Sequence, residues 1–219
     1  MTPNQITIAR VAAAFAAVAF YTCFNRSIAS DLAAVTLTIT AIALDGVDGY
    51  IARKRGLATP LGAQIDILGD RMIENLFFTF FAATGLISLW VPVVFFVRGT
   101  LTDFLRGIAS RSGRAGFGHD GMIETRWGRT LVSSRASRAA YASLKCLCFC
   151  YLGILPLATH LSIHRLSPGN LLLILWVGHG IVAATLLACI LRAVPVLWDG
   201  RHYFAAMEKP KSLPAAATR

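Results

Sequence analysis

The chain has 219 residues, of which 56% are hydrophobic and only 15% are charged, and its mean hydropathy is +0.62. This composition is too apolar for an ordinary water-soluble domain, and it predicts one all-α integral membrane domain covering residues 1–219. The formal net charge of +10 is compatible with binding to nucleic acid or to anionic lipid, and the positions of the basic residues distinguish the two.

Six apolar segments predict six transmembrane helices. Crossing the hydrocarbon core takes about 20 helical residues, and each segment is close to or above that length. Ahead of the first segment, the stretch TPNQITIAR, with Pro3 at a first-turn position, predicts a short helix lying at the membrane interface. A cleavable signal peptide at residues 11–24 is the alternative, which the five further segments disfavour. The six segments are 11–30, 32–52, 66–90, 91–108, 138–160 and 170–198.

The basic residues predict the orientation of the chain in the membrane. If the helices alternate in direction, the N-terminus, the 53–60 joint, the 109–137 loop and the 199–219 tail lie on one side. That side holds most of the Lys and Arg residues, so we expect both termini, including a basic tail at 199–219, to be cytoplasmic. The chain lacks an Arg- and Ser-rich presequence, which favours a bacterial inner (cell) membrane.

Nucleic-acid binding is disfavoured by the composition of the 109–137 loop. Only two aromatic residues, Phe117 and Trp127, lie among its arginines, and these arginines lie where anionic lipid headgroups are expected. We therefore expect a lipid bilayer as partner and no nucleic acid.

Acidic residues interrupt the second and third apolar segments. Asp45 and Asp48 are three residues apart, and Asp66, Asp70 and Glu74 follow at intervals of four, so each set shares one helix face. Carboxylates inside a bilayer are costly unless they are paired or bind a cation. An all-oxygen ligand set is typical of Mg²⁺, Mn²⁺ or Ca²⁺, so these helices predict a centre with one or two divalent cations. Glu74 either extends this centre or pairs with Arg71 or Arg98.

Arg53 follows the first acidic pair at the expected mouth of the site. A divalent cation together with an arginine is typical of a site that binds a diphosphate. Lys54 and Arg55, by contrast, are interpreted as the ordinary positive flank of a membrane helix.

The spacing of these residues resembles the signature of the CDP-alcohol phosphotransferase family. The signature reads D-x-x-D-G-x-x-A-R, then eight residues, then G-x-x-x-D-x-x-x-D, and eight specified positions are too many for a chance match. The opening PNQITIAR is also similar to the P-N-x-x-T-x-x-R start that is common in the family. The matching positions are Asp45, Asp48, Gly49, Ala52, Arg53, Gly62, Asp66 and Asp70.

The resemblance implies a role for each of these residues. Asp45, Asp48 and Asp66 would hold two Mg²⁺ or Mn²⁺ ions, and Asp70 would lie at the same metal site and act as general base. Arg53 would grip the diphosphate of CDP-diacylglycerol, while Gly49, Ala52 and Gly62 would allow close packing around the nucleotide. The acceptor hydroxyl would attack the lipid-side phosphorus and CMP would leave. Family members are commonly homodimers, so a homodimer is expected.

The acceptor alcohol is predicted from arginines outside the signature. Arg98 and Arg106 are about two helical turns apart, and Arg138 begins the fifth apolar segment, so the three would suit a phosphorylated acceptor. The stretch RGTLTDFLR resembles the phosphatidylglycerophosphate synthase branch, although Gly99 replaces its usual acidic residue and Arg135 and Arg138 replace its usual lysines. Glycerol 3-phosphate is therefore the favoured acceptor, with inositol phosphate, phosphatidylglycerol and serine as alternatives.

A cation transporter is the alternative from another class, since carboxylates inside a membrane also mark ion pathways. Permeation of a cation gains nothing from an arginine such as Arg53 beside the site, which disfavours this hypothesis. A catalytically silent scaffold is disfavoured because all four aspartates are present.

Overall fold

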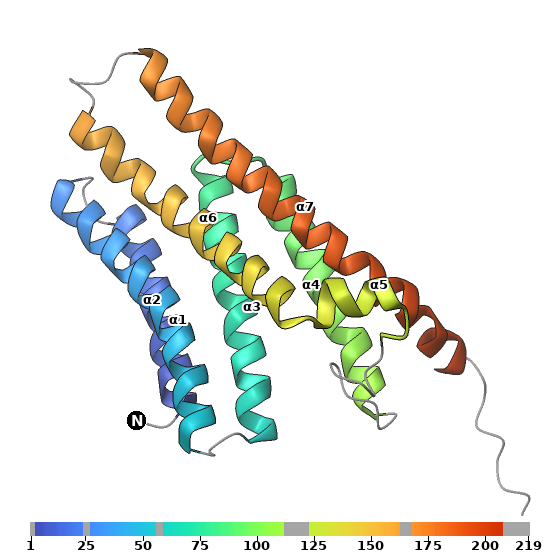
Figure 1. Ribbon diagram of the computed structural model, residues 1–219. Helices are drawn as coiled ribbons and strands as arrows, with labels where there is room; N and C mark the ends of the chain where they lie inside the picture. The colour runs from blue at the N-terminus through green and yellow to red at the C-terminus, as the bar shows by residue number, and fades with distance from the viewer. Residues whose placement is uncertain (1–2, 24–26, 56–58, 112–122, 163–167, 208–219) are drawn as a thin grey trace, which may run out of the picture. The chain divides into compact units, whose positions relative to one another are not determined.

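The computed structural model describes residues 3–23, 27–55, 59–111, 123–162 and 168–207, and the described part is helical without strands. The all-α prediction is therefore confirmed, and each predicted apolar segment corresponds to one long helix (Figure 1). The long helices are α1 (Pro3–Cys23), α2 (Ile28–Arg55), α3 (Pro60–Ala83), α4 (Trp90–Arg111), α6 (Arg135–Ser162) and α7 (Pro168–Met207).

The predicted short helix at the N-terminus is not a separate element, because α1 runs unbroken from Pro3 to Cys23. Ile6, Thr7 and Arg10 are buried where α1 packs against α2 and α3. The first turns of α1 are thus held by contact with neighbouring helices.

Four of the long helices are apolar and long enough to cross a membrane within the described residues, at Asn4–Cys23, Ile28–Asp45, Arg135–Thr159 and Gly169–Arg201. Helices α3 and α4 have 24 and 22 residues, which is sufficient length, but charged side chains interrupt both. The chain is therefore a multi-pass membrane protein with four clear membrane-spanning candidates.

The chain divides into two compact units. The first comprises Met1–Phe96 and Tyr141–Leu187, and the second comprises Val97–Ala140 and Ala188–Arg219. Helices α4, α6 and α7 each contribute residues to both units.

Aromatic side chains of α3 form the core of the first unit. Phe77, Phe78 and Phe81 are fully buried, and the Phe78 ring lies 4.2 Å from the ring of Phe95 and 4.8 Å from that of Phe149. These contacts pack α3 against α4 and α6. The helix that carries the acidic residues is therefore held in place by buried aromatic side chains.

Both ends of α3 are fixed by local interactions. The Thr59 hydroxyl caps the first turn by accepting a hydrogen bond of 3.0 Å from the Gly62 amide, and Pro60 supplies the fixed φ favoured there. At the other end, Gly85 has a φ of 77°, and the Leu86 amide donates to the Phe81 carbonyl in a Schellman arrangement. The acidic residues of α3 therefore lie on a helix of defined length.

The second unit orders a stretch that the sequence presents as loop. Residues 126–128 form the short helix α5, and Arg129–Ser133 form a π-helical turn. The Asp199 carboxylate accepts hydrogen bonds from the amides of Glu124 and Thr125 at 3.0 and 3.1 Å, and Arg192 donates to the Leu131 carbonyl at 2.6 Å. Asp199 belongs to α7, which continues to Met207, and the rest of the predicted tail lies outside the described residues.

Candidate metal centre

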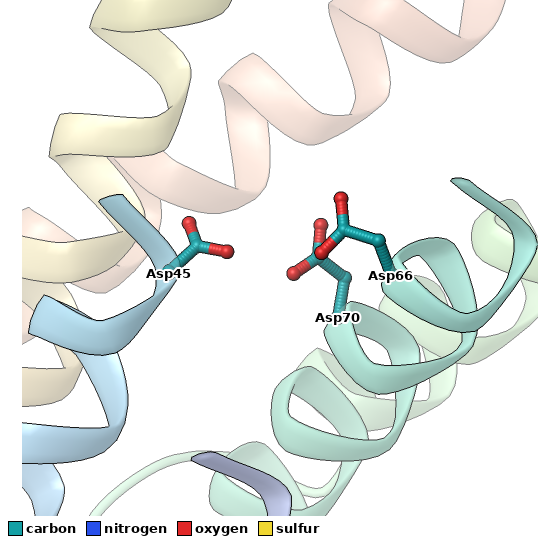
Figure 2. Close-up of side chains that lie close together, drawn as sticks. All are labelled: Asp45, Asp66 and Asp70. Carbon is teal, nitrogen blue, oxygen red and sulfur yellow. The ribbon is translucent and has the colours of Figure 1, made fainter. Parts of the chain in front are cut away.

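Three of the predicted aspartates converge in the first unit. Asp45 projects from α2, and Asp66 and Asp70 project from α3, with their carboxylates directed toward one another (Figure 2). One carboxylate oxygen from each residue lies within 4.8 Å of the others. The three side chains are 48%, 48% and 47% exposed, so water reaches the group.

A buried arginine from α1 completes this group. Arg10 is 1% exposed, and its Nη2 lies 2.8 Å from Asp70 Oδ1 and 3.1 Å from Asp66 Oδ1. Its Nη1 forms an ion pair with Asp45. The guanidinium therefore offsets part of the negative charge that three converging carboxylates would otherwise concentrate at one point.

Sequence reasoning did not assign Arg10 to the site. It noted Arg10 only as the last residue of the P-N-x-x-T-x-x-R start, far along the chain from the aspartates. The detectable signal was a lone arginine directly before an apolar stretch, which requires a partner if that stretch is buried.

Gly69 allows α1 to approach α3 closely enough for Arg10 to reach the aspartates. A Cβ atom at Gly69 would lie 2.8 Å from Thr7 Cγ2 and 3.3 Å from Arg10 Nη2. Thr7 is β-branched and buried, so its side chain cannot easily turn aside. The absence of a side chain at position 69 is thus a condition for this arrangement.

We expect Gly69→Ala to lower the free energy of unfolding by about 1–2 kcal/mol, because the new methyl group overpacks the contact between α1 and α3. Thermal unfolding of the detergent-solubilised protein measures the change. Gly180→Ala is the matched control, since its Cβ would meet no atom within 4 Å and alanine favours the helix. A Gly69→Ala protein as stable as wild type would contradict this packing.

The three carboxylates fit a divalent cation. They offer an all-oxygen donor set from two helices, which is the ligand chemistry that Mg²⁺ and Mn²⁺ prefer. Their partial exposure also gives the site a route to water. The aspartate triad, defined as Asp45, Asp66 and Asp70, therefore can bind a metal.

Four other predicted residues lie near the end of α2. The backbone of Asp48, Gly49, Ala52 and Arg53 is helical, and their side chains lie outside the described residues. Their roles as metal ligand, close-packing positions and diphosphate ligand stay predictions.

Gly62 lies in the first turn of α3, close to the beginning of α1. A Cβ atom there would lie 3.0 Å from both Asn4 Oδ1 and Thr59 Oγ1. Close packing between the helices therefore explains a glycine at this position. Its predicted contact with the nucleotide stays a prediction.

The three predicted acceptor-binding arginines belong to the second unit. Arg98 is buried, Arg106 forms an ion pair with Asp103 at 3.3 Å, and Arg138 is exposed in the first turn of α6. The aspartate triad belongs to the first unit, so the predicted joint pocket stays a prediction.

Glu74 pairs with two basic residues. Its Oε2 lies 3.1 Å from Arg71 Nη1 and 3.2 Å from Lys145 Nζ, and the side chain is 2% exposed. Pairing with Arg71 was one of the predicted outcomes, whereas Lys145 in α6 was missed. Lys145 is distant in sequence and lies in an otherwise apolar run, so no helical spacing connects it to Glu74.

Comparison with known proteins assigns the family. The sequence model of the CDP-alcohol phosphatidyltransferase family matches residues 1–176. This chain belongs to that family. The resemblance predicted from the aspartate signature is thereby confirmed, and the CDP-alcohol phosphatidyltransferase match includes both helices of the triad.

Two curated relatives resemble part of this chain. They are proteins of Rickettsia felis and Rickettsia bellii, each named CDP-diacylglycerol–glycerol-3-phosphate 3-phosphatidyltransferase. Each is 39% identical over 72 residues, which is 32% of this chain and 38% of the relative. The chain thus spans less than half the length of the curated relatives it matches.

Proposed function

We propose that this protein transfers a phosphatidyl group from CDP-diacylglycerol to an alcohol, with release of CMP. The family assignment supports the reaction class, and the names of the two Rickettsia proteins support glycerol 3-phosphate as the acceptor. The observation that carries the proposal is the convergence of Asp45, Asp66 and Asp70 beside a buried arginine.

The chain's own residues account for positioning and proton transfer. Asp70 accepts the proton of the acceptor hydroxyl, and that oxygen forms a bond to the lipid-side phosphorus. The bond from this phosphorus to the bridging oxygen breaks, and CMP leaves with that oxygen. Arg53 holds the diphosphate. Asp45, Asp48 and Asp66 would hold the divalent ions, whose positive charge would stabilise the negative charge that develops on the leaving phosphate.

The proposal includes the membrane arrangement. Helices α3 and α4 are proposed to complete a set of six spans, since their 24 and 22 residues are long enough to cross a membrane. Most of the Lys and Arg residues then lie on the side of both termini, which supports a cytoplasmic location for them and an inner bacterial membrane. We also propose a homodimer, on family resemblance alone.

Arg98, Arg106 and Arg138 are proposed to recognise the phosphate of the acceptor. Their charges favour glycerol 3-phosphate or inositol phosphate over serine, which has no phosphate. A cation transporter remains the less favoured function, since the guanidinium of Arg10 lies within hydrogen-bonding distance of two of the three carboxylates that would bind a passing cation.

The test is an assay with purified protein, CDP-diacylglycerol and Mg²⁺ or Mn²⁺. Glycerol 3-phosphate, inositol phosphate, phosphatidylglycerol and serine are supplied separately, and CMP release and the lipid product are measured. We expect CMP release with glycerol 3-phosphate and its loss after chelation with EDTA. No CMP release with any acceptor would contradict the proposed reaction.

A further inference from the structure

A cavity of about 110 Å³ extends beside the aspartate triad within the first unit. Asp45, Asp70 and Arg10 line it, and so do Glu74 and Lys145. The remaining walls are mainly apolar, with Ile42, Ile73 and Phe149 among them. An apolar cavity with a few polar groups is typical of a site for a small polar ligand.

Glu74 has unused hydrogen-bonding capacity at this cavity. Its Oε2 accepts from Arg71 and Lys145, whereas its Oε1 is buried and lacks a hydrogen-bond partner among the described residues. A carboxylate accepts several hydrogen bonds, and leaving one buried oxygen without any is costly. Glu74 therefore requires a donor that the surrounding side chains do not supply.

Lys145 has unused donors in the same place. Its ammonium group donates to Glu74 at 3.2 Å and lies 5.1 Å from the centre of the Tyr141 ring. An ammonium group has three N–H donors, so capacity remains for an acceptor in the cavity. The cavity thus offers one acceptor and one donor close together.

We propose that this cavity binds a hydroxyl group of the acceptor alcohol that does not itself react. A hydroxyl donates to Glu74 and accepts from Lys145, so a single group satisfies both residues. A phosphate is disfavoured there because three carboxylates line the cavity against only two cationic groups, those of Arg10 and Lys145. The inference rests on the proposed transferase function and adds a specificity determinant to it.

The geometry of α3 indicates which hydroxyl this is. Glu74 follows Asp70 by four residues, so the two carboxylates lie on the same helix face one turn apart. When Asp70 takes the proton of the reacting hydroxyl, a hydroxyl on the neighbouring carbon lies toward Glu74. In glycerol 3-phosphate, this is the hydroxyl on the middle carbon.

The experiment compares glycerol 3-phosphate with 3-hydroxypropyl phosphate, which lacks the middle hydroxyl. The wild-type protein should prefer glycerol 3-phosphate by at least about tenfold in kcat/KM, because the analogue leaves Glu74 and Lys145 without their partner. Glu74→Gln and Lys145→Met should each reduce this preference to about threefold or less. Arg71→Gln is the matched control, since Arg71 also pairs with Glu74 but does not line the cavity.

A second arm distinguishes the alcohol from the nucleotide, which also carries hydroxyl groups. It repeats the assay with 2′-deoxy-CDP-diacylglycerol. We expect the ratio of kcat/KM for the two lipids to be the same in both variants as in wild type. A changed preference between these lipids would assign the hydroxyl to the ribose and overturn the inference.

The remaining outcomes separate the inference from the proposed function. The inference is overturned if wild type shows no preference for glycerol 3-phosphate, or if both variants show the same preference as wild type. The transferase function stands in either case. If Glu74→Gln does not fold, Lys145→Met carries the comparison. No CMP release from wild type and no binding of either phosphate by calorimetry would overturn the function together with the inference.

Discussion

Asp70→Asn is expected to lower kcat by roughly a thousandfold, because an amide cannot take the proton of the acceptor hydroxyl. Binding of CDP-diacylglycerol should change little, since asparagine has nearly the same size and keeps an oxygen that can accept from Arg10. The measurements are CMP release at saturating acceptor and lipid binding by calorimetry.

Glu124→Gln is the matched control for this substitution. Glu124 is exposed and belongs to the second unit, and its replacement makes the same change from acid to amide. The control should turn over as wild type does. A kcat for Asp70→Asn within about threefold of wild type would contradict the role of Asp70 as general base, because losing a general base usually lowers kcat much more.

Arg10→Gln is expected to destabilise the metal-free protein by about 1–2 kcal/mol, since it leaves three half-exposed carboxylates without their buried counter-ion. Three carboxylates within 4.8 Å of one another would then repel without a buried cation between them. The melting temperature in EDTA should fall by roughly 2–8 °C.

Divalent cations should restore more stability to Arg10→Gln than to wild type. A metal ion supplies the missing positive charge, and a ligand that binds only the folded state stabilises it by mass action. The readout is the rise in melting temperature on adding Mg²⁺ or Mn²⁺, which does not depend on turnover.

Arg192→Gln serves as the control for loss of a buried arginine. Arg192 is 7% exposed and donates to the carbonyls of Leu131 and Val132 and to Ser137 in the second unit. Its loss should lower stability without any dependence on metal. Equal metal-induced shifts in wild type and Arg10→Gln would contradict a role for Arg10 as counter-ion of the triad.

The aspartate triad was predictable from the sequence because its spacing obeys helix geometry. Asp66 and Asp70 are four residues apart on one helix, and Asp45 ends the apolar part of the helix before it. A short connection makes the two helices neighbours, so local rules suffice to place these residues together.

Arg10 and Lys145 were not predictable as site residues because they come from helices distant in sequence. Their positions depend on how α1 and α6 pack on α3, including the close approach that Gly69 permits. A helical period identifies the face of one helix, but it does not identify the residue that a separate helix brings against that face.

The ordered stretch around α5 was missed for a related reason. Its backbone amides and carbonyls are satisfied by Asp199 and Arg192, about 60 to 75 residues later in the chain. Its own sequence carries polar residues and no helical period, so nothing local distinguishes it from a loop.

The half-exposed carboxylates of the triad have a consequence for the identity of the metal. Ligands that water reaches can exchange an ion without opening the helices, so the ion is not trapped during folding. Three carboxylates alone discriminate weakly between Mg²⁺ and Mn²⁺, and selection among such ions follows their availability. We therefore expect the free ion concentrations around the protein to decide which metal the triad binds, and changing the growth medium or the buffer should change the metal recovered.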